Sequence, residues 1–163
     1  MTTLSNVLWG ALALGLVTGM RSTLAPTMTS RALAAQDDID AADEPARTLA
    51  SHRAQQFLLP MATGELLGDK MPFAPDRTIL PSMMFRALSG GVTAAALASA
   101  RRQPLWLPAL VGATAALVSS KVGLALRKPY QANPYVNAAL GLTEDCVALA
   151  IGSAGLRCAL GKR

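Results

Sequence analysis

Aromatic and charged residues are both scarce in this chain. The sequence has only two Trp, two Tyr and three Phe, and charged residues make up 15% of its 163 positions. A surface that binds nucleic acid needs a basic groove with aromatic side chains on which bases can stack. The net charge of +5 is therefore not accompanied by the residues such a surface requires, and we expect no nucleic-acid partner.

Histidine and cysteine are nearly absent. The chain has one histidine, His52, and two cysteines, Cys146 and Cys158, which is too few for a metal site built on those ligands. The cysteines are twelve residues apart in one apolar segment, about 18 Å along a helix, so they cannot form a disulfide with each other. We expect both to be buried as small hydrophobic side chains.

Common catalytic motifs are also missing. The sequence contains no HExxH, no GxSxG and no glycine-rich phosphate loop. Ser22, Ser119 and Ser120 have no histidine nearby in the sequence, which disfavours a hydrolytic triad. The sequence therefore does not indicate an enzyme, and no cofactor is expected. A membrane enzyme acting on a lipid or phosphate group remains an alternative, with Glu65 and Asp69 as base or metal ligands and Arg21 and Arg77 on the phosphate.

Apolar residues are what the chain has in abundance. They make up 52% of it, with a mean hydropathy of +0.34, above what an ordinary soluble domain shows. Five segments are long and mainly apolar: Leu4–Met20, Phe57–Met71, Ser82–Ala100, Pro104–Leu126 and Val136–Leu160. We predict a single transmembrane domain over residues 1–163. It is an all-α integral membrane protein, a bundle of four to five transmembrane helices with one Pro-broken or re-entrant segment, multi-pass in the cell (inner) membrane.

The connections between these segments have their own signals. Half of the ten acidic residues lie between positions 37 and 44, which predicts a polar acidic loop at about 31–53. Pro26 predicts an extended or turn conformation at Ala25. If the chain crosses five times and the N-terminus lies outside, eight Lys and Arg residues lie inside and five outside. This excess agrees with the positive-inside rule and favours that orientation.

Small residues recur in the first apolar segment. Gly15 and Gly19 are four apart, with Gly10 and Ala11 one or two turns earlier, a spacing that lets another helix approach closely. Together with the small size of the chain, these faces predict a homo-oligomer. The lipid bilayer and a small ion or solute are the other expected partners.

The remaining five acids lie where the composition is apolar or next to it. A carboxylate at membrane depth costs several kcal/mol unless it is paired or hydrated. Glu65 and Asp69 share one helix face, whereas Glu144 and Asp145 point about 100° apart, so only one of that pair needs to face the same site. We therefore predict an ion- or substrate-binding site that contains these residues and the nearby bases: Glu65, Asp69, Asp76, Glu144, Asp145, Arg21, Lys70 and Lys121.

Arg21 stands at the end of the first apolar segment. Its side chain can extend to the lipid headgroups, as long basic side chains near helix ends do. It can equally pair with one of the buried acids. The sequence leaves both interpretations open.

The placement of these charges resembles a known family of membrane proteins. The pattern Glu-x-x-x-Asp-Lys-x-Pro is present as Glu65, Asp69, Lys70 and Pro72. It is followed by Lys121, Arg127, Pro134, Asn137 and the pair Glu144–Asp145. Over nearly the whole chain these residues resemble the uncharacterised integral membrane protein family called domain of unknown function 4126. The resemblance implies the helical membrane fold and the choice of site residues, and it implies no reaction.

Two functional hypotheses follow from this pattern. The first is a small membrane transporter or channel with a buried carboxylate site for a cation or proton between the second and last helices. Coordination of Mg²⁺ or Ca²⁺ by the same carboxylates is a variant of it, and the identity of any metal is unknown. The second is a non-catalytic membrane scaffold or accessory subunit whose buried ion pairs lock the packing of the helices.

Overall fold

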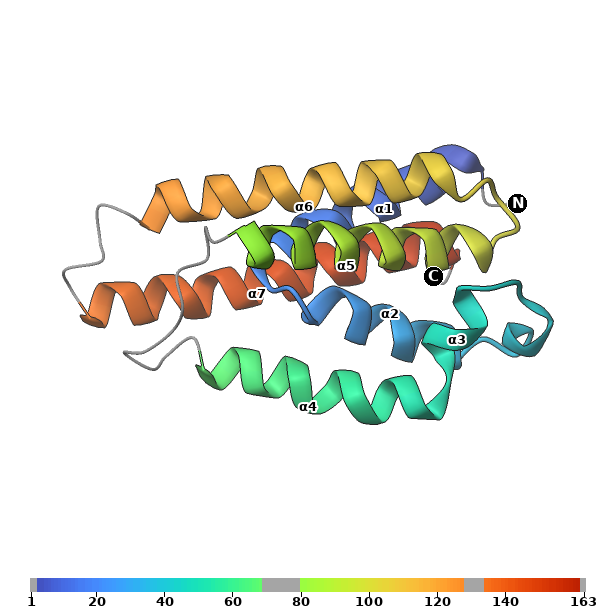
Figure 1. The fold of residues 1–163 in the computed structure, drawn as a ribbon, viewed down its shortest axis with the longest axis horizontal. Helices are drawn as coiled ribbons and strands as arrows, with labels where there is room; N and C mark the ends of the chain where they lie inside the picture. The colour runs from blue at the N-terminus through green and yellow to red at the C-terminus, as the bar shows by residue number, and fades with distance from the viewer. Residues whose placement is uncertain (1–2, 69–79, 128–133, 162–163) are drawn as a thin grey trace.

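We analysed a computed structural model, which describes residues 3–68, 80–127 and 134–161. All regular secondary structure in these ranges is helical (Figure 1). The helices are α1 Leu4–Met20, α2 Leu24–Ala34, the 3-10 helix η1 Ile39–Ala41, α3 Ala46–Ala50, α4 His52–Gly68, α5 Leu80–Ser99, α6 Trp106–Arg127 and α7 Pro134–Leu160. The all-α prediction is confirmed for the described residues, and four of the five predicted apolar segments match helices to within two or three residues at each end.

Helix α1 is the centre of the bundle and packs against α5, α6 and α7. Its glycines allow this close approach. A Cβ atom on Gly15 would lie 2.5 Å from the carbonyl oxygen of Gly112 on α6, and one on Gly10 would lie 2.7 Å from the Cβ of Ala159 on α7. The predicted small-residue contacts are thus present, and they are made within the chain.

Helix α2 was not predicted, and the expected extended or turn conformation at Ala25 is wrong. Ala25 and Pro26 are the second and third residues of α2. Proline is tolerated in the first turn of a helix because its missing N–H would have no partner there. Helix α2 begins inside the bundle and runs back toward the end where α1 begins (Figure 1).

The predicted acidic loop contains more structure than its composition indicates. It overlaps the last turn of α2 and the start of α4, and between these lie η1 and the single-turn helix α3. Two hydrogen bonds hold this connection to the bundle: Ser99 Oγ donates to the Asp43 carbonyl at 2.6 Å, and Ser30 Oγ donates to the Leu49 carbonyl at 2.6 Å. The connection is therefore anchored on α2 and α5.

Helix α2 returns the chain toward the end of the bundle at which α1 begins, and this determines where the two termini lie. Both termini lie at the same end of the bundle (Figure 1), whereas five crossings would place them at opposite ends. The number of crossings and the orientation of the chain in a membrane stay predictions.

Two helices in the described part of the chain are long and apolar enough to cross a bilayer, at Trp106–Leu126 and Ala139–Leu160. Helix α1 is apolar but has only 17 residues. The expected burial of the cysteines is wrong, because Cys146 and Cys158 are both free and exposed on α7.

Candidate functional site at the junction of α1 and α2

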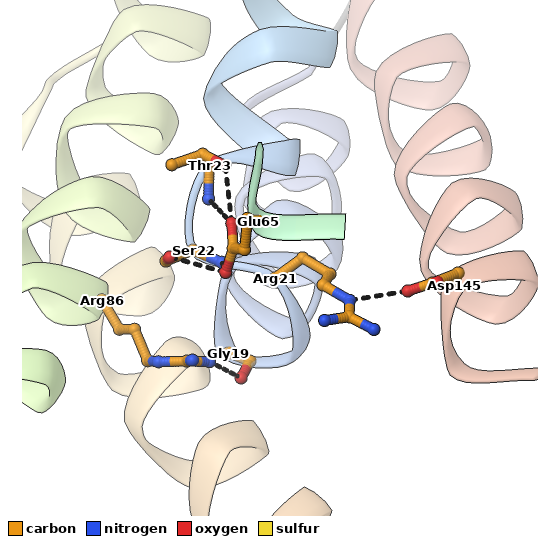
Figure 2. Close-up of polar contacts among 7 residues, drawn as sticks. All are labelled: Gly19, Arg21, Ser22, Thr23, Glu65, Arg86 and Asp145. Atoms are coloured by element: carbon orange, nitrogen blue, oxygen red, sulfur yellow. Dashed lines mark hydrogen bonds and ion pairs between the residues drawn. The ribbon is translucent and has the colours of Figure 1, made fainter. Parts of the chain in front are cut away.

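A cluster of polar side chains surrounds the point where α1 ends and α2 begins (Figure 2). Arg21 has extended backbone angles, with φ −138° and ψ 109°, and its N–H donates to the Val17 carbonyl. This break leaves carbonyl groups at the end of α1 and N–H groups at the start of α2 that need partners. We call the residues that supply or surround these partners the junction cluster: Gly19, Arg21, Ser22, Thr23, Glu65, Arg86 and Asp145.

Glu65 of α4 binds the start of α2 through both carboxylate oxygens. Its Oε1 accepts hydrogen bonds from the N–H and the Oγ of Ser22, both at 2.7 Å. Its Oε2 accepts from the N–H of Thr23 at 2.8 Å and from Thr23 Oγ1 at 2.6 Å. A negative charge at a helix N-terminus also interacts favourably with the helix dipole. Glu65 therefore faces protein, and it links α4 to the start of α2.

Arg21 pairs with an acid of the last helix. Its Nε lies 2.6 Å from Oδ1 of Asp145, and the two side chains are only 2% and 13% exposed. Figure 2 shows the Arg21 side chain pointing to α7. Of the two interpretations that the sequence left open, the structure selects pairing with a buried acid.

The end of α1 receives a second buried arginine. Arg86 of α5 is 5% exposed, and its Nη1 donates a hydrogen bond to the Gly19 carbonyl. Ser120 Oγ of α6 donates to the same carbonyl at 3.1 Å, and Ser89 Oγ donates to the Ser22 carbonyl at 2.7 Å. A cation at a helix C-terminus is stabilised by the dipole. The junction cluster thus holds two arginines and two carboxylates, which balance in charge.

Of the predicted site residues, the structure brings Arg21, Glu65 and Asp145 together. Ser22, Thr23 and Ser89 were missed. Ser22 and Thr23 are residue types that favour the start of a helix, and Pro26, three residues after Thr23, instead suggested a turn. No sequence signal identifies Ser89.

The other predicted residues lie elsewhere. Glu144 is half-buried on α7 and points toward α6, where its Oε1 lies 3.8 Å from the position that a Cβ on Gly123 would occupy. Lys121 is exposed on α6, outside the junction cluster. Asp69, Lys70 and Asp76 lie outside the described residues. Glu144 and Asp145 therefore face different surroundings, as their helical spacing predicted.

Among the described residues, no group of three or more His, Cys, Asp or Glu side chains is placed to hold a metal ion. The carboxylates of Glu65 and Asp145 instead accept hydrogen bonds from N–H and O–H groups of the chain itself.

Comparison with known proteins adds nothing to this description: no family model, no curated protein and no solved structure matches the chain. The family resemblance drawn from the sequence motifs stays a prediction.

Proposed function

We propose that the chain is a small membrane transporter or channel for a cation or proton, and that the junction cluster is its site. The observation that supports this most is the broken helix at the junction. Helices interrupted at membrane depth, with their ends directed at charged groups, form the ion sites of many transporters. The irregular backbone of residues 21–23 is covered by protein, as a bilayer requires.

The proposal includes a membrane arrangement. We place α4, α5, α6 and α7 across the bilayer, with α1 entering it and α2 returning to the side from which α1 entered (Figure 1). The eleven residues of α2 extend about 16 Å, roughly half of a hydrocarbon core of about 30 Å. The end that holds both termini also holds five arginines of helix ends and connections: Arg31, Arg47, Arg53, Arg101 and Arg102. The positive-inside rule then places both termini in the cytoplasm.

Protonation of the two carboxylates would change the junction cluster in a defined way. An ionised carboxylate only accepts hydrogen bonds, whereas a protonated one also donates. The partners of Glu65 are four N–H and O–H donors of Ser22 and Thr23, so a protonated Glu65 no longer matches them all. Loss of the Asp145 charge would likewise weaken its pairing with Arg21. Proton or cation binding would thereby be coupled to movement of α4 and α7.

One observation supports the alternative hypothesis, that the chain is a membrane scaffold. Both oxygens of Glu65 are occupied by hydrogen bonds within the chain, and Asp145 is paired with Arg21. A buried ion pair of this kind can act by fixing one arrangement of helices. Under this hypothesis the chain holds a partner protein in the membrane and transports nothing.

Flux through proteoliposomes separates the two. Purified protein is reconstituted and tested with a panel of cations, with and without a pH gradient, beside Asp145→Asn and the control Asp37→Asn. Asp37 is an exposed acid of the loop after α2, so its variant removes the same charge away from the site. We expect flux with the unaltered protein and Asp37→Asn, and loss of flux with Asp145→Asn.

Absence of flux from protein that is folded and correctly inserted would reject the transport proposal and favour the scaffold. Equal flux from Asp145→Asn and the unaltered protein would remove the junction cluster from the mechanism. Circular dichroism and gel filtration in mild detergent check that each variant is folded before it is reconstituted.

A further inference from the structure

A groove lies between α2 and α7, away from the junction cluster. Its volume is about 300 Å³. The described residues that line it are two of α2 and four of α7: Met28, Ala32, Ser153, Leu156, Arg157 and Leu160. We call it the α2–α7 groove. It shares no residue with the junction cluster.

The groove exists because α2 and α7 touch closely at one point and separate beyond it. A Cβ atom on Gly152 of α7 would lie 2.9 Å from Cε and 3.0 Å from Sδ of Met28. Past this contact α2 contributes Ala32, a side chain too small to fill the space between the helices. The groove therefore lies between the Met28–Gly152 contact and the ends of the two helices. Both helices end on the side of the bundle that holds the termini (Figure 1).

The described lining is hydrocarbon with one cation at the helix end. Met28, Leu156 and Leu160 are apolar, and the hydroxyl of Ser153 donates to the Ala150 carbonyl at 3.0 Å. The lining also includes Arg157, which is exposed in the last turn of α7. Within the described part of the chain, its side chain makes no ion pair and no hydrogen bond. The guanidinium is thus available to a ligand.

Other basic residues lie near Arg157 at this end of α7. Lys162 and Arg163 follow the helix in the sequence. Arg101 is already occupied, because it donates a hydrogen bond to the Leu160 carbonyl. In the membrane arrangement proposed above, this end faces the cytoplasm. Anionic lipids give that leaflet a negative surface potential, and basic pockets between transmembrane helices on that side bind their headgroups.

We propose that the α2–α7 groove binds one anionic phospholipid. The phosphate accepts hydrogen bonds from the Arg157 guanidinium, whose planar geometry matches two phosphate oxygens. One acyl chain lies along Ala32 and Leu156 toward Met28. The charge selects an anionic headgroup, and the hydrocarbon lining selects a phosphate that carries an acyl chain over free phosphate.

A second groove provides a contrast within the same molecule. It lies between α1 and α7 and is larger, about 430 Å³, but none of the residues that the structure describes in its lining carries a charge. It offers no charged group to an anionic headgroup. The proposal for the α2–α7 groove requires that the chain lies in a membrane, but it does not require ion transport. Absence of ion flux would therefore leave it standing.

Titration with dioctanoyl phosphatidylglycerol tests the proposal. The readout is the NMR signal of methionine methyl groups labelled with ¹³C, in protein solubilised in dodecyl maltoside. Met28 lines the α2–α7 groove, whereas Met20 lines a cavity between α6 and α7 that also includes Glu144. We expect a saturable shift at Met28 and none at Met20. Dioctanoyl phosphatidylcholine, whose headgroup has no net charge, should bind at least about fivefold more weakly. Glycerol phosphate, which lacks acyl chains, should cause no shift.

Variants separate the charge from the space. Arg157→Gln should weaken binding of phosphatidylglycerol at least about fivefold and leave that of phosphatidylcholine unchanged. Arg53→Gln is the matched control, because Arg53 is an exposed arginine at the same end of the bundle that does not line the groove. Ala32→Leu fills the groove and should weaken both lipids. Ala154→Leu, in the groove between α1 and α7, should change neither.

Several results would overturn the proposal. Equal affinity for the two lipids would do so, as would unchanged affinity in Arg157→Gln. An equal loss in Arg53→Gln would show attraction to the basic end of the bundle as a whole. Glycerol phosphate binding as tightly as the lipid would remove the groove from recognition. A Met28 signal that moves with protein concentration in the absence of lipid would assign the groove to a second copy of the chain. If Arg157→Gln does not fold, the three probes on the unaltered protein still decide the question.

Discussion

Glu65 contacts Thr23 twice with the same carboxylate oxygen: Oε2 accepts from the backbone N–H at 2.8 Å and from Oγ1 at 2.6 Å. The two residues are 42 positions apart, so a side chain of α4 caps a helix that begins elsewhere in the sequence. This relationship makes the start of α2 dependent on the position of α4. It also lets the role of the junction cluster in stability be measured independently of any transport.

Replacing Glu65 with glutamine should destabilise the protein. The amide keeps one acceptor oxygen and presents an NH₂ group to donors of Ser22 or Thr23, so some of the four hydrogen bonds are lost. We expect the free energy of unfolding to fall by about 2 kcal/mol. Denaturant titration in detergent, followed by circular dichroism, measures it. Asp37→Asn removes an exposed charge and should not change it; a value for Glu65→Gln equal to that control would contradict the capping role.

The Arg21–Asp145 pair should show strong coupling. Asp145→Leu alone removes the carboxylate 2.6 Å from Nε of the 2% exposed Arg21, and loss of one member of a buried pair costs about 3–5 kcal/mol. The double variant Arg21→Met with Asp145→Leu should recover most of that loss. A double-mutant cycle of unfolding free energies gives the coupling, and additive single effects would mean that the pair is not formed.

Glycines at two positions should respond oppositely to alanine. A Cβ at Gly15 would lie 2.5 Å from the Gly112 carbonyl oxygen, so Gly15→Ala should force α1 and α6 apart and cost about 1–3 kcal/mol. At Gly64, within α4, no atom of the described residues beyond its chain neighbours and its own helix backbone lies within 4 Å of the added Cβ. Gly64→Ala should therefore stabilise the protein by up to about 1 kcal/mol through helix propensity. Thermal unfolding of the two variants makes the comparison, and destabilisation of similar size at both positions would contradict it.

The two termini should be accessible from the same side of the membrane. A reporter tag fused to each end, in vesicles of known orientation, should react with a membrane-impermeant reagent from one face only, and from the same face for both tags. The reason is that α2 reverses the direction of the chain after α1 (Figure 1). Reaction of the two tags from opposite faces would show an odd number of crossings and would contradict the described topology.

Most helices could be predicted from the sequence because each is a long apolar run bounded by charges or prolines. Helix α2 could not. It is short, its segment contains Pro26 and two threonines, Thr27 and Thr29, and in isolation a helix of eleven residues is only marginally stable. Burial of residues such as Ala25 and Leu33 against the bundle and capping by Glu65 stabilise it. Both of these arise only once α4 and α5 are in place.

The exposure of the cysteines also could not be predicted from the sequence. Their residue type predicts burial, yet both are exposed on α7. Which side of α7 faces the bundle is decided by its small residues: Gly155 lies against Gly10 and Ala13 of α1. The close approach that glycine permits thus outweighs the general preference of cysteine for the interior.

The sequence by itself determined that the chain is helical, that glycines of α1 mark close helix contacts, and that acids in apolar segments need partners. These follow from local composition and spacing, which each segment carries wherever it lies. Only the tertiary structure decided the partners. Arg21 meets Asp145 across 124 positions, Glu65 binds backbone N–H groups instead of a base, and Glu144 faces a cavity. Which groups meet depends on where α1 breaks and on how α2 and α4 pack beside the break, and no local pattern encodes those long-range contacts.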